Sequence, residues 1–210
     1  MPSFLFLVGF NRHCTLTSAS NNGRGCSEDE AKSRIYMMDS QGLIVSSRHD
    51  NELGGPKSEF VRPDCPQLDS LMDSVRHIRP SVLIGASAKP GAFTRDILRE
   101  MSTNNKIPIV FVLSNPSNLA ECSAQLAYKA TEWRCIFVSG SPSDPVQTPN
   151  GRLLVPSQGN NCYVFPGLVN ALSLAVIRPV TDKLLLTAAM VINFRSNIFF
   201  LIENELSCLT

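Results

Sequence analysis

Small and polar residues follow four of the expected strands in this sequence, and their types and places could do chemistry. Ligands of open parallel sheets bind outside the carboxyl ends of the strands, so the residues directly after each strand are the first candidates. The four sets are Asp39-Ser40, Gly85-Ala86-Ser87, Ser114-Asn115-Pro116 and Ser139-Gly140-Ser141. Their hydroxyl, amide and carboxylate groups favour a ligand cleft at one edge of the sheet over chance loop composition.

Asp39 is the most informative single residue. A carboxylate that closes the second strand of a dinucleotide-binding fold can hydrogen-bond the ribose hydroxyls, although a turn aspartate fits the residue equally well. The glycine-rich G-x-G-x-x-G turn that should accompany it is absent, and only Gly9 stands in a comparable place. We therefore expect the first phosphate-binding turn to be incomplete.

The elements that must position these residues alternate regularly between strands and helices. Apolar runs predict buried strands at 34–38, 81–87, 107–113 and 134–138. Helical spacing predicts helices at 68–78 and 120–130, and a third helix whose apolar face carries Phe93, Ile97, Leu98 and Met101. Strands that are apolar on both faces indicate an α/β fold, with a mostly parallel sheet and helices on both of its faces.

The composition argues against several classes of protein. The 210 residues carry 19 Lys and Arg against 18 Asp and Glu, and this balance argues against a nucleic-acid or acidic-lipid surface. No apolar run reaches the roughly 18 residues of a membrane span. The seven cysteines include no C-x-x-C pair, so they favour reduced thiols of an intracellular protein over a zinc site or a disulfide framework.

The first 27 residues contain no Asp or Glu, and three interpretations of this segment stay open. A Ser-rich leader without acids is typical of an organelle transit peptide. Phe4–Val8 could also serve as a short apolar region of a secretion signal, or it could be the first strand of the sheet.

Several longer motifs occur together in one order. They are SEDEA at 27–31, YMMDSQGLIVS at 36–46, LSNPSNLAEC at 113–122, IFVSGSPSDP at 136–145 and QGNNCYVFPG at 158–167. Taken together, they resemble the malic enzymes, nicotinamide-dependent oxidative decarboxylases of malate. The resemblance covers residues 25–192 and implies a Rossmann-type NAD(P)-binding domain there, with an unmatched leader at 1–24, an unmatched tail at 193–210 and truncation at both ends.

The resemblance also implies a role for individual residues at the cofactor's adenosine end. Asp39 would bind the adenine ribose, and Ser40 stands where NADP-preferring members often have Ser. Gln41 replaces the Lys that is usual in those members and weakens the NADP preference. Lys57 is a candidate partner for the 2′-phosphate. The cofactor is therefore expected to be NADP or NAD.

Further residues would surround the rest of the cofactor and the substrate. Ala86 and Ser87 would line the cofactor site, Leu113, Ser114 and Asn115 would meet the nicotinamide, Gly140 would permit close backbone approach, Asn161 would bind the cofactor, and Asn115 and Asn160 would bind malate. Asn160 and Asn161 could instead cap the helix expected at 164–177. Lys89-Pro90 departs from the small residues of the family, and a proline makes backbone contacts there doubtful.

The catalytic groups of the family lie upstream of the part that this chain resembles. These are a Tyr acid, a Lys base, an Arg for the substrate and the acidic ligands of Mg²⁺ or Mn²⁺, and residues 1–24 offer no counterpart. We therefore assign no catalytic residue and no metal ligand to this chain.

The expected function is a malic-enzyme-type oxidoreductase domain that supplies the cofactor pocket and part of the malate site for converting malate to pyruvate and CO₂. The alternative is an inactive, truncated isoform that binds nucleotide or associates with subunits; a chain without stable function is a third option. Expected partners are malate or pyruvate and another copy or a full-length malic enzyme, with no nucleic acid and no membrane. The expected location is intracellular, in cytoplasm or mitochondrion.

Overall fold

The computed structural model describes residues 4–8, 28–48 and 55–192. The chain divides into two compact units, residues 1–159 and residues 160–210, and each unit is described by itself. The first unit holds the sheet and every expected strand end of the cleft. The second unit is helical.

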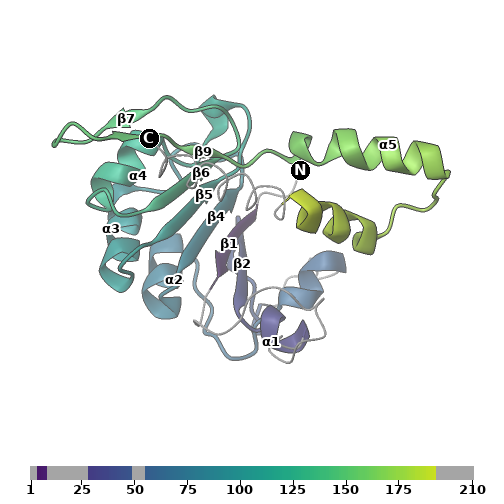
Figure 1. Ribbon diagram of the computed structural model, residues 1–210. Helices are drawn as coiled ribbons and strands as arrows, with labels where there is room; N and C mark the ends of the chain where they lie inside the picture. The colour runs from purple at the N-terminus through teal and green to yellow at the C-terminus, as the bar shows by residue number, and fades with distance from the viewer. Residues whose placement is uncertain (1–3, 9–27, 49–54, 193–210) are drawn as a thin grey trace. The chain divides into compact units, whose positions relative to one another are not determined.

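Within the described residues, seven strands form one sheet in the order β3-β2-β1-β4-β5-β6-β9 (Figure 1). Their bounds are β1 Phe4–Val8, β2 Ile35–Asp39, β3 Gly42–Leu43, β4 Val82–Ala86, β5 Ile109–Val112, β6 Ile136–Ser139 and β9 Ser157–Gln158. Strands β4, β5, β6 and β9 are parallel, whereas β1 is antiparallel to both of its neighbours. A separate antiparallel ribbon joins β7 (Val146–Gln147) to β8 (Leu153–Leu154).

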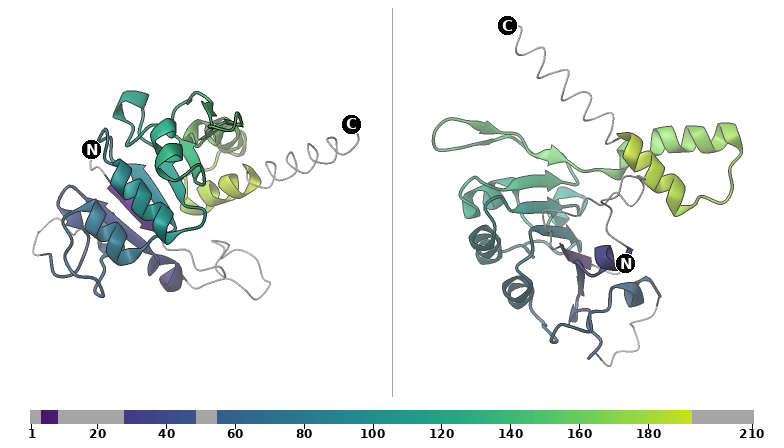
Figure 2. Two further views of the ribbon diagram at one scale, coloured as in Figure 1. Left: turned by 90° about the vertical axis from the view of Figure 1, so that its left-hand side faces the viewer. Right: turned by 60° about the horizontal axis from the view of Figure 1, so that its bottom comes forward.

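Three helices lie side by side on one face of this sheet (Figure 2). They are α2 (Leu71–Ile78), α3 (Arg95–Asn104) and α4 (Ala124–Ala130). The short elements α1 (Glu28–Lys32) and η1 (Gly55–Phe60) lie toward the other side, near β2 (Figure 1). The predicted fold class, a mostly parallel sheet flanked by helices, is confirmed.

Each of the three helices begins at a side chain that accepts a backbone hydrogen bond. Ser70, Thr94 and Ser123 accept from the amides of Asp73, Ile97 and Leu126, respectively. These caps satisfy N–H groups that the first helical turn leaves unpaired. They also explain why α2 and α4 start later than predicted, at residues 71 and 124; the 3₁₀ turn η2 (Ser117–Leu119) occupies part of the remainder.

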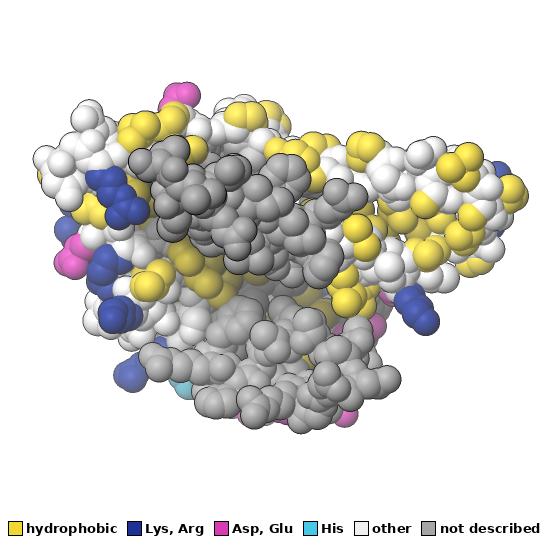
Figure 3. Space-filling view, in the orientation of Figure 1, with side chains coloured by type: hydrophobic (Ala, Val, Ile, Leu, Met, Phe, Trp, Pro, Cys, Tyr) yellow, Lys and Arg dark blue, Asp and Glu magenta, His cyan; other side chains and the backbone are white. Residues whose placement is uncertain are grey.

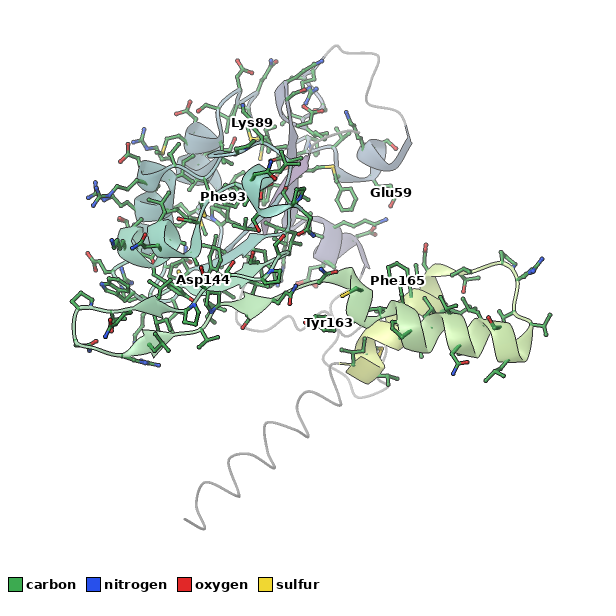
Figure 4. The ribbon with its side chains drawn as sticks, turned by 90° about the horizontal axis from the view of Figure 1, so that it is seen from above. Glu59, Lys89, Phe93, Asp144, Tyr163 and Phe165 are labelled. Atoms are coloured by element: carbon green, nitrogen blue, oxygen red, sulfur yellow. The ribbon has the colours of Figure 1, made fainter. Side chains whose placement is uncertain are left out.

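The core lies between the sheet and these helices. Leu83, Val110 and Val112 alternate inward along β4 and β5, and Phe93 is fully buried against them, as its place inside the first unit illustrates (Figure 4). Burying a side chain of this size stabilises the fold by about 1.5–3 kcal/mol. The core therefore fixes the strands whose ends form the candidate cleft.

Strand β1 bears on one of the three interpretations of the start of the chain. Phe4–Val8 pairs with β2 and β4, which confirms the interpretation of this segment as a strand. Because β1 is antiparallel, Phe4 pairs with Ala86 at the carboxyl edge of β4, and Val8 pairs with Val82 at the opposite edge. The described part of β1 thus ends at the edge away from the cleft. The expected incomplete phosphate-binding turn, with Gly9, falls on residues outside the described part of the chain.

The second unit begins with the 3₁₀ turn η3 (Asn161–Tyr163) and continues into α5 (Phe165–Ala175) and a helix at 182–192. Helix α5 ends at Val176, which adopts a left-handed conformation with φ of 51°. Both helices expose large apolar side chains, among them Val169, Leu174 and Leu186 (Figure 3).

The cysteines differ in accessibility, and this difference predicts their reactivity. Cys65, Cys122, Cys135 and Cys162 are free thiols; Cys122 is buried and Cys162 is exposed. Burial raises the pKa of the Cys122 thiol to about 12, so almost none of it is thiolate at neutral pH.

We expect a thiol reagent to label Cys162 promptly and Cys122 only on unfolding, as measured by peptide mass mapping. C162S should remove that label; prompt labelling of Cys122 in the folded chain would contradict the assignment.

Candidate functional site

The predicted site residues of the first unit gather at the carboxyl edge of the sheet. Asp39 closes β2, Ala86 closes β4, and Leu113 and Gly140 directly follow β5 and β6. Because β2, β4, β5 and β6 run in the same direction, these positions share one edge of the sheet. The structure therefore brings together residues that are far apart in the sequence.

The carboxylate of Asp39 is buried and paired with two cations. Its oxygens lie 3.0 Å from Nη1 of Arg48 and 2.9 Å from Nζ of Lys57. The amide of Gln41 donates a third hydrogen bond, at 3.0 Å. Burial alone would raise the pKa of Asp39, but the hydrogen bonds from Arg48, Lys57 and Gln41 outweigh it and lower that pKa below its usual value.

A tight hairpin holds Asp39 in this place. Asp39 pairs with Gly42 across the β2–β3 turn, and Gly42 has φ of +109°, a backbone conformation that L side chains rarely adopt. A Cβ on Gly42 would also come within 2.5 Å of the carbonyl oxygen of Leu68. The next amide, that of Leu43, donates to the same carbonyl at 2.8 Å. Glycine is therefore required for this turn to lie against residue 68.

A second buried carboxylate, that of Glu121, joins the loops after β4 and β5. Its Oε1 atom accepts from the amide and the hydroxyl of Ser87, both at 2.8 Å, and from the hydroxyl of Ser114 at 2.5 Å. The Glu121 side chain is fully buried, and its Oε2 atom has no hydrogen-bond partner among the described residues. Three donors on one oxygen offset the cost of burying this acid.

The absence of a side chain at Gly85 makes room for Glu121. A Cβ built on Gly85 would lie 2.6 Å from Cδ and 2.8 Å from Oε2 of Glu121. Non-bonded heavy atoms do not approach so closely, so any side chain at position 85 would displace the Glu121 carboxylate.

The serines of the two loops turn inward, toward Glu121. Ser87 and Ser114 are buried, while Ala86 and Ala88 on the same loop are exposed. The amide of Ala88 donates to Oγ of Ser114 at 2.8 Å, and the amide of Lys89 donates to Oγ of Ser87 at 3.3 Å. These hydroxyls support the cleft from behind, and their role as direct cofactor contacts stays a prediction.

Asn115 presents an exposed carboxamide beside the loop after β6. Its Oδ1 atom accepts from the hydroxyl of Ser141, and no hydrogen bond from its amide nitrogen occurs among the described residues. Gly140, which precedes Ser141, permits the close approach of Leu113, whose carbonyl oxygen would lie 2.5 Å from a Cβ at this position. The geometry thus gives Gly140 a structural reason that differs from the predicted approach of a cofactor.

Asn160 and Asn161 belong to the second unit. Oδ1 of Asn160 accepts from the amide of Cys162 at 2.9 Å, so Asn160 caps the turn η3. This differs from the capping alternative of the sequence analysis, which placed the pair at the start of the helix expected at 164–177. Helix α5 begins after Val164, and no side chain accepts a hydrogen bond at its start. The side chain of Asn161 lies outside the described part of the structure, and both ligand roles stay predictions.

The described residues offer no set of three His, Cys, Asp or Glu side chains that could hold a metal ion. The Mg²⁺ or Mn²⁺ of the resembled family therefore has no fitting set of donors in this part of the chain. Among the same residues, no helix is long and apolar enough to cross a membrane.

Comparison with known proteins decides the family. Residues 12–197 match the family model "Malic enzyme, NAD binding domain". This chain belongs to the malic enzyme family. It is 48% identical over 168 residues to the NADP-dependent malic enzyme of Columba livia and 45% identical over 168 residues to that of Homo sapiens. A mitochondrial NADP-dependent malic enzyme of Mus musculus is 44% identical over 165 residues.

The matched region covers about 80% of this chain and 27–30% of those three malic enzymes. The predicted family and the predicted truncation relative to it therefore agree with the comparisons. The predicted cofactor class, NAD or NADP, is confirmed at the level of the family, because the matched region is the NAD-binding domain of malic enzymes.

Two residues of the site were missed by sequence reasoning. Glu121 entered the sequence analysis only as part of a motif, because a glutamate in the first turn of an expected helix normally indicates a solvated helix start. Arg48 belongs to none of the predicted elements, and an arginine is normally exposed, yet its side chain is 3% exposed. The available signal was Glu121 within the LSNPSNLAEC motif together with a glycine inside a buried strand, a position that often marks close approach.

The salt bridges of Asp39 predict how stability depends on pH. A carboxyl with a lowered pKa binds its proton more weakly in the folded chain than in the unfolded chain, so acid favours unfolding. Its contribution is complete above the unfolded pKa of about 4 and is lost as the pH falls through the lower, folded value. Urea unfolding between about pH 6 and about pH 3 should show a steeper loss for the wild type than for D39N. D144N, which alters an exposed aspartate, should follow the wild type; equal slopes for the wild type and D39N would refute this.

The Gly85–Glu121 contact predicts a large cost for one added methyl group. G85A should lower the free energy of unfolding by about 2 kcal/mol or more, because the buried acid has no space to move into. The matched control is G167A in α5, where nothing lies within 4 Å of the new Cβ. Its stability should be unchanged or higher by up to about 1 kcal/mol. Equal stabilities of the two variants in urea would show that β4 adapts freely.

Proposed function

We propose that this chain is a nucleotide-binding domain of the malic-enzyme type that takes NADP, or NAD, at the carboxyl edge of its sheet. The observation that carries the proposal is the placement of Asp39 and Asn115 at the ends of β2 and β5, two strands that run in the same direction. In such sheets the cofactor lies across this edge, with its two halves over different strands. Asp39 would bind the adenine ribose and Asn115 would meet the nicotinamide end.

NADP is the favoured cofactor. Ser40 follows Asp39 and is exposed, so its hydroxyl can reach a 2′-phosphate. The ammonium group of Lys57 lies 2.9 Å from Asp39 and thus stands beside the position proposed for the ribose. Phosphate groups bind best to such cations and hydroxyl donors. The similar enzymes of Columba livia and Homo sapiens are named NADP-dependent.

The family reaction would be the oxidative decarboxylation of malate to pyruvate and CO₂. Bound NAD(P) would supply the hydride acceptor. Because Ser141 occupies Oδ1 of Asn115, the amide nitrogen of Asn115 would donate to a malate carboxylate. Asn160 keeps its proposed role as a malate ligand. No group in the described residues is assigned to take the hydroxyl proton or to protonate the product enolate.

The second candidate is a catalytically inactive chain that binds nucleotide or associates with full-length malic enzyme. The observation behind it is that the described residues hold no group of three His, Cys, Asp or Glu side chains that could bind the metal ion of the family. We propose an intracellular location, in cytoplasm or mitochondrion, because reducing compartments keep cysteines such as Cys65 and Cys162 free.

Calorimetry of the purified chain with NADP and with NAD tests the proposal. We expect weak binding, with NADP preferred, because the glycine-rich turn is missing. K57A should weaken NADP binding about tenfold and change NAD binding less than about twofold, the effect of one lost charge-assisted hydrogen bond. K129A alters an exposed lysine of α4 and should change neither. No heat with either nucleotide would overturn the proposal.

Enzyme assays separate the two candidate functions. With malate, NADP and Mn²⁺, the chain alone should reduce no NADP above a blank. Reduction above the blank would show that the chain holds its own catalytic groups. Co-purification with full-length malic enzyme would favour the subunit-associating candidate.

A further inference from the structure

We infer that Glu121 is a positioning residue that locks the loops after β4 and β5 into one cleft wall, so that the two loops move together. The inference deepens the proposed nucleotide-binding function and rests on it. It starts from a carboxylate that is fully buried and that touches both loops through a single oxygen.

The hydrogen bonds of Glu121 form two chains with one direction. In the first chain, the amide of Ala88 donates to Ser114, whose hydroxyl donates to Oε1 of Glu121. In the second, the amide of Lys89 donates to Ser87, whose hydroxyl donates to the same Oε1. The first chain crosses from one loop to the other, so the backbone at 88 is held by a residue that follows β5.

Only an acceptor at Oε1 fits this arrangement. Both serine hydroxyls donate to Oε1, which leaves the lone pairs of each hydroxyl for a backbone amide. A glutamine could keep one carbonyl oxygen in place of Oε1, but its NH₂ group would then lie at Oε2, where the described structure offers no acceptor and Gly85 lies close. The isosteric E121Q change is therefore expected to disturb the network without changing its volume.

The network shapes the surface that faces the proposed cofactor. Ala88 adopts φ of 51°, a left-handed conformation that is unfavourable for a residue with a Cβ. The hydrogen bond from the amide of Ala88 to Oγ of Ser114 holds this conformation. Ala88 and Lys89 are exposed on this loop, where Figure 4 labels Lys89. If the hydrogen bonds to Glu121 are lost, this loop loses its conformation and Ser114 loses its position next to Asn115 at the same time.

Hydrogen exchange of the full chain, followed by mass spectrometry without nucleotide, tests the coupling. E121Q should speed exchange in peptides that contain 86–89 and in peptides that contain 113–116, by about tenfold in each, because both loops lose an anchor worth a charged hydrogen bond. S114A should speed exchange in the same two peptides, and S114T, which keeps the hydroxyl, should restore slow exchange. The control S74A removes an equally buried serine hydroxyl from α2 and should change neither loop.

Calorimetry with NADP completes the test. E121Q and S114A should raise the dissociation constant of NADP about tenfold or more, whereas S74A should leave it within about twofold. If E121Q does not fold, S87A, S114A and the double variant carry the test. Coupled loops require the double variant to speed exchange by less than the sum of the two single effects, and additive effects would overturn the coupling.

Two results have different meanings. Exchange that rises in one loop alone, or in the whole domain equally, overturns the positioning role of Glu121, because a merely structural residue would loosen the fold without selecting these loops. A wild-type chain that binds no NADP, but whose two loops still loosen together in E121Q, overturns the proposed function and leaves the coupling intact.

Discussion

The acceptance of three hydrogen bonds by one buried oxygen of Glu121 is the constraint on which the rest of the cleft depends. The backbone around Glu121 extends the same attachment, because its carbonyl accepts from the amide of Phe93 and the neighbouring carbonyl of Ala120 accepts from Gly91. The segment that leads from β4 to α3 is thus fixed to residues 120 and 121 at both of its ends. The side chain of Phe93, the largest fully buried one among the described residues, packs in the apolar core, so this residue links the polar contacts of Glu121 to that core.

The antiparallel strand β1 separates the two halves of the proposed nucleotide site. It lies between β2, which carries Asp39, and β4, which carries Ala86. A strand in this position that ran parallel to its neighbours would deliver a turn to the cleft, between the ribose and the nicotinamide, where a pyrophosphate lies in dinucleotide folds. Strand β1 completes the hydrogen bonding of the sheet and delivers its first residue, Phe4, to that edge instead. Among the described residues, β1 thus contributes to the sheet and brings no turn to that edge.

Much of the fold followed from local patterns, because strands such as Ile109–Val112 are apolar on both faces and helices such as Arg95–Asn104 have one apolar side. The position of Asp39 was also predictable, since a carboxylate at a strand end depends only on nearby sequence. The direction of β1 was not predictable, because a strand of five apolar residues has the same pattern in both directions. The pairing of β1 depends on β2 and β4, the two strands between which it lies in the folded sheet.

The network of Glu121 escaped prediction for a different reason. A glutamate is normally exposed, and its burial here depends on donors from Ser87 and Ser114, which only the folded sheet brings to it. The inward turn of these two serines escaped prediction with it. Sequence patterns report which residues are polar, but they do not report which polar residues satisfy one another in three dimensions.

The bare backbone of Gly85 has a meaning for how this fold can vary over time. The Glu121 side chain occupies the space that a side chain at position 85 would need, so the residues allowed at the two positions depend on each other. A lineage that acquires a side chain at the first position must shorten the second, and it then has to find another acceptor for two serines. The same dependence applies to a redesign of this nucleotide cleft, in which the glycine, the acid and both serines have to be changed together.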